Sequence, residues 1–277
     1  MPALPLDVVL QRLHQIAPLR LAESWDNVGL LVGDRETSVE RVMTCLTVTR
    51  EVVEESISRR VGLLIAHHPL PFKPLTRITA DSTAGQMLLA LIAGGVALYS
   101  AHTAFDSAEG GINAMWAEML NLRHIRALEP LAESADEAIG SGRFGSLSSA
   151  LPLDAFAAQV ATVVGASRCR IVSATEGTAA KRVTKVAVAC GSGGGLLAAA
   201  KRRGCDAMVT GEATFHTCLE AQASGISLIL VGHYHSERFA MVRLAQQLGQ
   251  EFAELEVFAS DHDVDPLKDG PRGIGKH

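Results

Sequence analysis

The chain alternates short apolar runs with longer segments whose apolar residues recur at helical spacing. The runs are rich in aliphatic and β-branched residues, which is typical of buried strands. They cover residues 41–49, 62–68, 96–102, 185–191, 206–212 and 226–233. The helical patterns cover residues 50–60, 85–95, 196–204 and 218–225. Strands that alternate with helices of this length predict an α/β fold with helix-covered sheets.

The two ends and the middle of the chain depart from this alternation. Residues 1–27 have the spacing of an amphipathic helix and lack the basic start and apolar stretch of a signal peptide. Residues 129–150, rich in Ala, Ser, Gly and Glu, are interpreted as a connector or a small surface excursion. The tail over residues 260–277 is predicted to be loose.

The pattern also repeats within the chain. In residues 96–120, and again in 226–248, an apolar strand ends on a small residue followed by a histidine, and a carboxylate follows four residues later. These elements are His102 with Asp106, and His233 with Glu237. We interpret the similarity as a diverged duplication. The first α/β half is placed in residues 1–128, and the second, with the connector and tail, in 129–277.

Charge, cysteines and hydropathy limit the class of protein. The net charge of -5 and pI of about 6.1 argue against an electrostatic nucleic-acid binder, which needs a basic face. The five cysteines show no CxxC spacing and most lie in apolar stretches, which is typical of buried reduced thiols. No run approaches the roughly 18 apolar residues of a membrane span. We therefore expect a cytoplasmic protein that is not inserted in a membrane.

Polar side chains gather at the predicted carboxyl ends of four strands, where open α/β sheets present ligand sites. In LLIAHHPLPFKPL, residues 63–75, an apolar strand runs directly into two histidines and then prolines. The histidines and carboxylates at the four ends are His67, His68, His102, Asp106, Glu212, His216, His233 and Glu237. Such ligands suit zinc, iron, manganese or nickel. Two facing sets suit a centre of two ions, which can ionise a shared water near neutral pH.

The alternative for a single buried histidine is a core residue with satisfied hydrogen bonds. The His67–His68 pair and the two His-x-x-x-acid elements together favour metal binding. His102 and His235 are candidates for supporting residues that orient the ligands. The remaining histidines have no such context and are expected on the surface: His14, His124, His262 and His277.

Two further segments are open to two interpretations each. The glycine-rich turn Cys190–Leu197 either packs closely against other backbone or offers amides to an anion, although it lacks the residues of a P-loop. The segment Glu23–Gly33, which contains Trp25, Asp26 and Asn27, is either a polar loop near the site or a helix cap followed by a strand. No G-x-S-x-G elbow or cysteine–histidine pair supports nucleophilic catalysis.

Several motifs, in this order along the chain, resemble those of the Nif-three-like family, whose members often carry the label GTP cyclohydrolase 1 type 2. They are SWDNVGLLVG, HHPLPFKPL, SAHTAFD with the following GGIN, ACGSGGGLL and GHYHSE. The resemblance extends from about residue 4 to 258. It implies a duplicated, intertwined α/β fold, two divalent transition-metal ions between the halves, and a ring-shaped homohexamer. The ligands that it implies are His67, His68, Asp106, His233 and Glu237.

Two function classes follow. The first is a metal-dependent hydrolase of the GTP cyclohydrolase type, acting on a small, nucleotide-like substrate. The second is a non-catalytic metal- or cofactor-binding protein that acts by docking a ligand or partner. Thr47 and Glu212 stand where aspartate is common in the family, so the resemblance leaves the substrate open. An open coordination position facing a pocket would favour the hydrolase.

Overall fold

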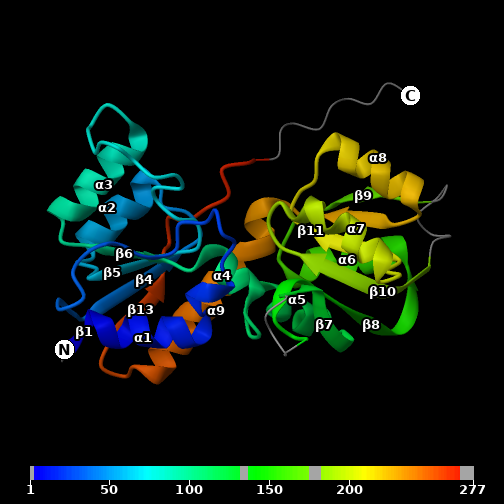
Figure 1. The fold of residues 1–277 in the computed structure, drawn as a ribbon, viewed down its shortest axis with the longest axis horizontal. Coiled ribbons are helices and arrows are strands. Elements are labelled where there is room, and N and C mark those ends of the chain that lie inside the picture. Colours follow the sequence, from blue (N-terminus) through cyan, green and yellow to red (C-terminus); the bar gives the residue numbers. More distant parts are fainter. Residues whose placement is uncertain (1–2, 132–136, 175–181, 269–277) are drawn as a thin grey trace.

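The computed structural model describes residues 3–131, 137–174 and 182–268. Figure 1 shows two α/β lobes side by side, with helices α4 and α9 between them. The mixed α/β fold with helix-covered sheets that the sequence predicts is confirmed. The division into residues 1–128 and 129–277 stays a prediction.

The first lobe contains a sheet whose three central strands are parallel. Its strand order is β13 (Glu256–Ala259), β4 (Arg41–Cys45), β5 (Leu63–Ala66), β6 (Ala97–Ser100) and β2 (Gly29–Val32). Strand β13 is parallel to β4, and β2 is antiparallel to β6. A short ladder joins β1 (Leu4–Pro5) to β3 (Ser38–Val39). The parallel strands β4, β5 and β6 therefore end at one edge, which is where the site lies.

The second lobe contains a mixed sheet. Its order is β7 (Arg123–Pro130), β8 (Gly140–Pro152), β10 (Arg182–Ala189), β11 (Ala207–Thr210), β12 (Ser227–Leu230) and β9 (Arg170–Val172). Strands β10, β11 and β12 are parallel, and β7, β8 and β9 pair antiparallel with their neighbours.

Helices cover both sheets. They are α1 (Leu6–Ile16), η1 (Leu19–Leu21), α2 (Arg50–Ser58), α3 (Thr83–Ala93), α4 (His102–Ser107), α5 (Ile112–Met119), α6 (Leu153–Val163), η2 (Gly193–Leu196), α7 (Leu197–Arg202), α8 (Phe215–Ser224) and α9 (His233–Glu251). Each expected strand and helix of the alternating pattern overlaps an observed element, with boundaries that differ by up to four residues, and the N-terminal amphipathic helix is α1. None of the described helices is long and apolar enough to cross a membrane.

Alternate residues of the central strands face different cores. In β5, Leu63 and Ile65 pack with α1 and α9, while Leu64 packs on the opposite face with α2 and α3. Burial on both faces explains why this strand is uniformly apolar. The cluster that contains Leu63 continues through α5 and α9 to Val186 of β10, so the two lobes share one core.

Three predictions are corrected by the structure. Residues 129–150 are not a connector, because β8 occupies much of this range and pairs with both β7 and β10. The segment after Ala259 is fixed at its start, since Asp263 is buried and accepts a hydrogen bond from the Leu46 amide at 2.6 Å. The end of the predicted tail, residues 269–277, lies outside the described part.

The prediction that His14 lies on the surface is wrong, because this side chain is half-buried on α1 beside Tyr99. His124 and His262 are exposed as expected, and His277 lies outside the described residues. All five cysteines are free; Cys45, Cys190 and Cys205 are buried, and the other two are half-buried.

Candidate metal centre

Backbone pairing brings the two adjacent histidines to the end of β5. The amides of His67 and His68 donate to the carbonyls of Cys45 and Leu46 at 3.0 and 2.9 Å, so both continue the pairing with the chain that leaves β4. Successive residues of an extended chain point in opposite directions. His67 is accordingly buried, and His68 reaches the cavity.

The other predicted ligands lie on two helices that each follow a strand. Asp106 is on α4, which follows β6, and His233 and Glu237 are on α9, which follows β12. Residues four apart lie on one helix face, so His233 and Glu237 point the same way. The turn before α9 requires Gly232, whose φ of 92° an L side chain rarely adopts.

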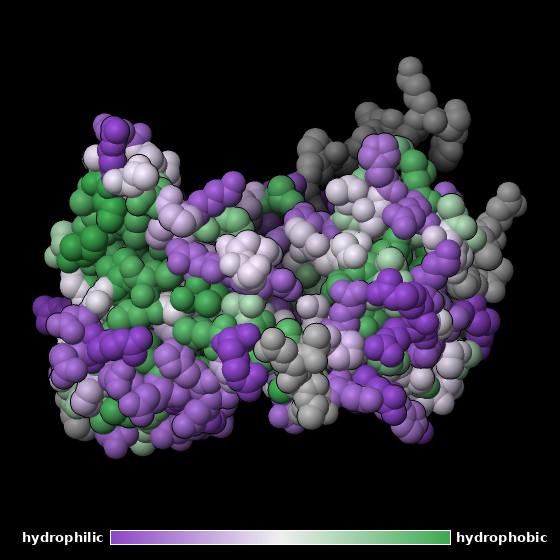
Figure 2. Space-filling view, viewed as in Figure 1, coloured by the Kyte–Doolittle hydropathy of each residue, from purple (hydrophilic) through white to green (hydrophobic). Residues whose placement is uncertain are grey.

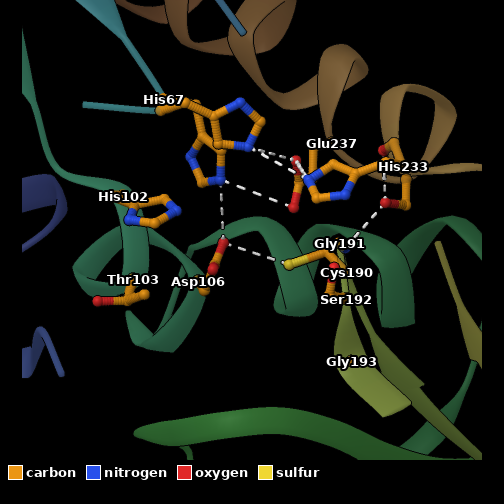
Figure 3. Close-up of polar contacts among 12 residues, drawn as sticks. His67, His102, Thr103, Asp106, Cys190, Gly191, Ser192, Gly193, His233 and Glu237 are labelled. Carbon is orange, nitrogen blue, oxygen red and sulfur yellow. Dashed lines mark hydrogen bonds and ion pairs between the residues drawn. The ribbon is translucent and has the colours of Figure 1, made fainter. Parts of the chain in front are cut away.

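Figure 3 shows His67, Asp106, His233 and Glu237 gathered at one place, and His68 contacts Glu237 there as well. Glu237 Oε2 is 3.2 Å from Nε2 of His68 and 3.1 Å from Nε2 of His233, and its Oε1 is 3.8 Å from Nε2 of His67. Asp106 Oδ1 is 3.7 Å from the same nitrogen of His67. The Nε2 atoms of His68 and His233 are only 3.3 Å apart. The duplicated His-x-x-x-acid elements therefore meet at one place.

The donor atoms are those that a cation would satisfy. The His67 side chain is 1% exposed, and neither of its ring nitrogens has a hydrogen-bond partner in the described structure. A buried polar atom without a partner is costly. Two groups of side chains could each hold an ion, His67 with His68 and His102, and His68 with His233 and Glu237; within each group the donor atoms lie within 4.8 Å of one another.

Partners at the far side of each ring direct the nitrogens of His68 and His233 toward this centre. Thr47 Oγ1 is hydrogen-bonded to Nδ1 of His68 at 2.7 Å. Nδ1 of His233 is hydrogen-bonded to the Glu212 carboxylate at 2.8 Å, so the ring directs its Nε2 at Glu237 and His68. Such partners fix the tautomer and orientation of metal-binding histidines.

The charges of the cluster depend on one another. Burial alone would raise the pKa of Glu237, but His67 and His233 lower it well below its ordinary value. The hydrogen bond to Glu237 raises the pKa of His233 to about 9. Burial raises the pKa of Asp106, and the nearby Glu237 charge raises it further. Positive charge close to Glu237 and Asp106 therefore stabilises their ionised carboxylates. A bound metal ion would supply such a charge.

His102 approaches the centre from α4. Its Nδ1 is hydrogen-bonded to Asp26 Oδ1 at 2.8 Å, and Asp26 Oδ2 also accepts from the Thr103 amide at 3.1 Å. Figure 3 shows the His102 ring beside those of the ligands. Asp26 thus holds His102 in place. Residues 23–27 lie beside the candidate centre, and the strand of the other interpretation is also present, as β2.

The glycine-rich turn packs closely against the ligands. Gly191 has a φ of 58°, and a Cβ there would lie 2.3 Å from Glu237 Oε1. The Gly191 amide donates to Ser236 Oγ at 2.9 Å. Beside it, the Cys190 thiol donates to Asp106 Oδ1 at 3.2 Å. The close-packing interpretation of this turn is confirmed, although the turn also lines the cavity described next.

The cluster opens onto a cavity of about 580 Å³. His68, Asp106, His233 and Glu237 line it, together with side chains and backbone from both lobes: Glu23, Trp25, Phe72, His102, Thr103, Asn113 and residues 189–193. His68 and His233 keep 23% and 34% of their side chains exposed. A small molecule can therefore reach the ligand atoms from the cavity.

Two histidines that follow the same strands do not join the cluster. His216 is exposed on α8 against Phe215. His235 points elsewhere, with its Nε2 4.0 Å from Asp265 Oδ2. Sequence reasoning did not pair Thr47, Cys190 or Asn113 with the groups that they contact at the site. Each immediately follows an apolar strand or opens a helix, but nothing in its local pattern indicates its partner.

Comparisons with known proteins agree with this architecture. A family profile described as Duf34/NIF3 (NGG1p interacting factor 3) matches residues 5–266. A "GTP cyclohydrolase 1 type 2 homolog" of Clostridium perfringens is 29% identical over 95% of this chain and 98% of its own. "NIF3-like protein 1" of Drosophila melanogaster is 33% identical over 95% and 88%. The structure of a Bacillus cereus protein related to NIF3 superposes with a TM-score of 0.87 over 97% and 99% of the two chains, at 23% identity.

Proposed function

This chain belongs to the DUF34/NIF3 family, and on that premise we propose that it binds two divalent transition-metal ions and hydrolyses a small, nucleotide-like molecule. The observation that carries the proposal is the convergence of three imidazole nitrogens on the buried Glu237 carboxylate beside an open cavity. Zinc, iron, manganese and nickel suit this ligand set.

The residues divide into those that hold the ions and those that hold the ligands. His67, His68, Asp106, His233 and Glu237 would bind the ions, with the Glu237 carboxylate beside the three histidines. Two such ions would lower the pKa of a bound water toward 7 and would so supply a nucleophile. Thr47 and Glu212 fix the rings of His68 and His233, and Cys190 donates to Asp106.

The exposure of the cluster favours the hydrolase over a non-catalytic docking protein. A structural metal site closes its coordination with protein ligands, whereas a catalytic site keeps a position open. His68 and His233 face the cavity, so a substrate can approach. The docking protein remains the alternative if metal-loaded protein hydrolyses nothing.

Metal content tests the binding proposal. Wild-type protein, reconstituted and desalted, should retain close to two ions per chain by elemental analysis. The double variant His67→Ala, His68→Ala should lose them, while the control variant His216→Ala should retain them because His216 lies on the exposed face of α8. Equal metal content in the wild type and the double variant would overturn the proposal.

The name of the Clostridium relative suggests GTP as a substrate to test. Formate release from GTP by metal-reconstituted wild type should be compared with that of Asp106→Asn, which keeps the size of the side chain. Formate release that is absent from the wild type, or unchanged in Asp106→Asn, would rule out this site as a GTP cyclohydrolase centre. The proposal that the protein is a hydrolase would then have to be tested with other small substrates.

We also propose a cytoplasmic homo-oligomer, with the hexameric ring as the form that the family resemblance implies. Figure 2 shows hydrophobic residues gathered over the lobe that carries α2 and α3. Ile57, Leu89 and Ile92 on these helices are each more than a third exposed, which suits burial against a second copy. Light scattering of wild type and Ile92→Glu tests this, and a wild-type monomer would contradict it.

A further inference from the structure

Two large aromatic side chains stand exposed at the cavity. Trp25 is 59% exposed and Phe72 is 50% exposed, although both line the cavity that contains the candidate ligands. Their ring centroids are 5.9 Å apart at an interplanar angle of 43°. The His102 ring lies 6.0 Å from each of them, at interplanar angles of 78° to Trp25 and 73° to Phe72. Half or more of each side chain therefore remains open to a ligand that packs against an aromatic ring.

The loops that carry these rings are tied together. Asn27 Nδ2 donates to the Pro71 carbonyl at 2.8 Å, which links the loop of Trp25 to the loop of Phe72. Asp26, next to Trp25, is held by His102 and Thr103. The two loops are therefore held together before any ligand arrives, which lowers the entropy that ordering them on binding would cost.

The charges around the cavity restrict what can bind there. Its carboxylates are those of Glu23, Asp106 and Glu237, and no lysine or arginine of the described residues lines it. Phosphate groups are recognised mainly by cationic side chains and bidentate guanidinium groups. The glycine-rich turn also lines the cavity, but its Cys190, Gly191 and Gly193 amides donate to oxygens of the protein. The protein itself therefore offers little to a polyphosphate, whereas the aromatic side chains suit an uncharged ring.

We propose that Trp25 and Phe72 form an aromatic clamp that stacks the planar nitrogen heterocycle of a ligand without a polyphosphate, such as a nucleobase or nucleoside. The inference deepens the proposed function, because it assigns the part of the substrate that lies beside the metal centre. Stacking on an aromatic side chain tolerates different bases, since every base has a π-face. The clamp sets the class of substrate rather than its exact identity.

Tryptophan fluorescence provides the test, because the chain has two tryptophans. Trp116 is 1% exposed and donates its Nε1 to the Ser236 carbonyl at 2.8 Å, so it is shielded from ligands. Guanosine should quench the emission of Trp25 in wild-type protein, and Trp25→Phe should lose the quenching. Calorimetry should show guanosine binding about tenfold more weakly to Phe72→Leu and to Trp25→Leu, as expected for the loss of one stacked ring.

Matched variants and probes make the result decisive. Phe215→Leu removes an aromatic side chain that is 73% exposed on α8 and does not line the cavity, and its affinity for guanosine should equal that of wild type. Thermal melts of all variants should coincide, because the replaced side chains are exposed. GTP should bind more weakly than guanosine to metal-stripped protein. Equal affinity of Phe72→Leu and wild type, or tighter binding of GTP, would overturn the clamp.

Two further outcomes distinguish the aromatic clamp from a cation site and from the hydrolase proposal. Choline that competes more strongly than guanosine would overturn the proposal in favour of a cation site, since ammonium groups also bind aromatic faces. Guanosine binding by metal-stripped protein would support the clamp even if metal-loaded protein hydrolyses nothing. In that case the hydrolase proposal fails and the clamp stands, so the two failures are distinguishable.

Discussion

Gly191 shows how closely the backbone approaches the candidate ligands. Its φ of 58° already disfavours an L side chain, and an added Cβ would lie 2.3 Å from Glu237 Oε1. Gly204 has a similar φ of 68° but nothing within 4 Å of an added Cβ. Substitutions at Gly204 and Gly191 can therefore be compared to separate the cost of backbone strain from the effect of a side chain that touches Glu237.

We expect Gly204→Ala to lower the free energy of unfolding by about 1 kcal/mol, which is the cost of the left-handed conformation alone. Gly191→Ala should cost more and should also lower metal content, because Glu237 must move away from the new methyl group. Urea unfolding and elemental analysis measure the two effects. Equal stability losses together with unchanged metal content in Gly191→Ala would contradict the close packing of Gly191 on Glu237.

At this scale the sequence identifies the clustered residues better than it identifies their partners. His67, His68 and the two His-x-x-x-acid elements could be predicted because each directly follows an apolar strand. Polar side chains at such a place are costly to bury unless they bind a partner. Thr47, 21 residues from His68, and Cys190, 84 residues from Asp106, could not be paired. Their contacts depend on how strands β4 and β10 are placed, which no local pattern specifies.

Strand β8 is one of the elements that the sequence patterns missed. Its segment is rich in glycine and serine, so it lacks the regular apolar alternation of a half-buried strand. Its neighbours β7 and β10 supply hydrogen bonds on both edges, and Phe144 and Leu147 supply the buried contacts. The strands of the parallel core were predictable because burial on both faces makes them continuously apolar.

Arg143 of β8 fixes the end of the helix that carries Asp106. It is 1% exposed, and its guanidinium donates to the carbonyls of Gly140, Gly142, Ser107 and Ala108. Arg143→Met should lower the free energy of unfolding by roughly 3 kcal/mol, because it leaves buried carbonyls without donors. Arg126→Met, on the exposed face of β7, is the control and should change stability little. A difference below 1 kcal/mol between the variants would contradict this role.

Glu55 joins α2 to the segment that follows β13. It accepts hydrogen bonds from Ser260 Oγ and, at 3.2 Å, from the Asp261 amide, and it pairs with Arg59 at 3.0 Å. Burial alone would raise the pKa of Glu55, but these donors lower it below its ordinary 4.5. The folded protein therefore holds the ionised carboxylate more firmly than the unfolded chain does. This stabilisation is present above pH 4.5 and is lost as the pH falls through the lower, folded pKa.

Glu55→Gln should accordingly be less stable than wild type at neutral pH, and the difference should shrink as the pH falls below 4.5. Urea unfolding at a series of pH values measures it. Glu54→Gln, on the exposed face of the same helix, should follow the wild-type pH profile. If the difference in the free energy of unfolding between Glu55→Gln and wild type stays constant with pH, the carboxylate charge does not help to join α2 to the segment that follows β13.

Helix α9 contacts both lobes and joins them into one structural unit. It begins beside β12 of the second sheet and runs to the first, where Thr44 Oγ1 of β4 donates to the Met241 carbonyl at 2.7 Å. Near its start, the Ser236 carbonyl accepts from Trp116 on α5. The candidate ligands span the same junction, since His67 and His68 extend from the first sheet and His233 and Glu237 belong to α9. Because one core cluster runs through both lobes, we expect a single unfolding transition.

A metal ion bound at this junction should therefore stabilise both lobes together. A ligand that binds only the folded state at about 1,000 times its Kd adds roughly 4 kcal/mol, which corresponds to a rise in Tm of about 10 °C for a chain of this size. Circular dichroism reports the helices of both lobes, and the emission of buried Trp116 reports the junction; zinc should shift both melting curves equally. The variant His67→Ala, His68→Ala should melt at the same temperature with and without zinc. A shift confined to one signal would mean that the lobes unfold separately and that α9 does not couple them.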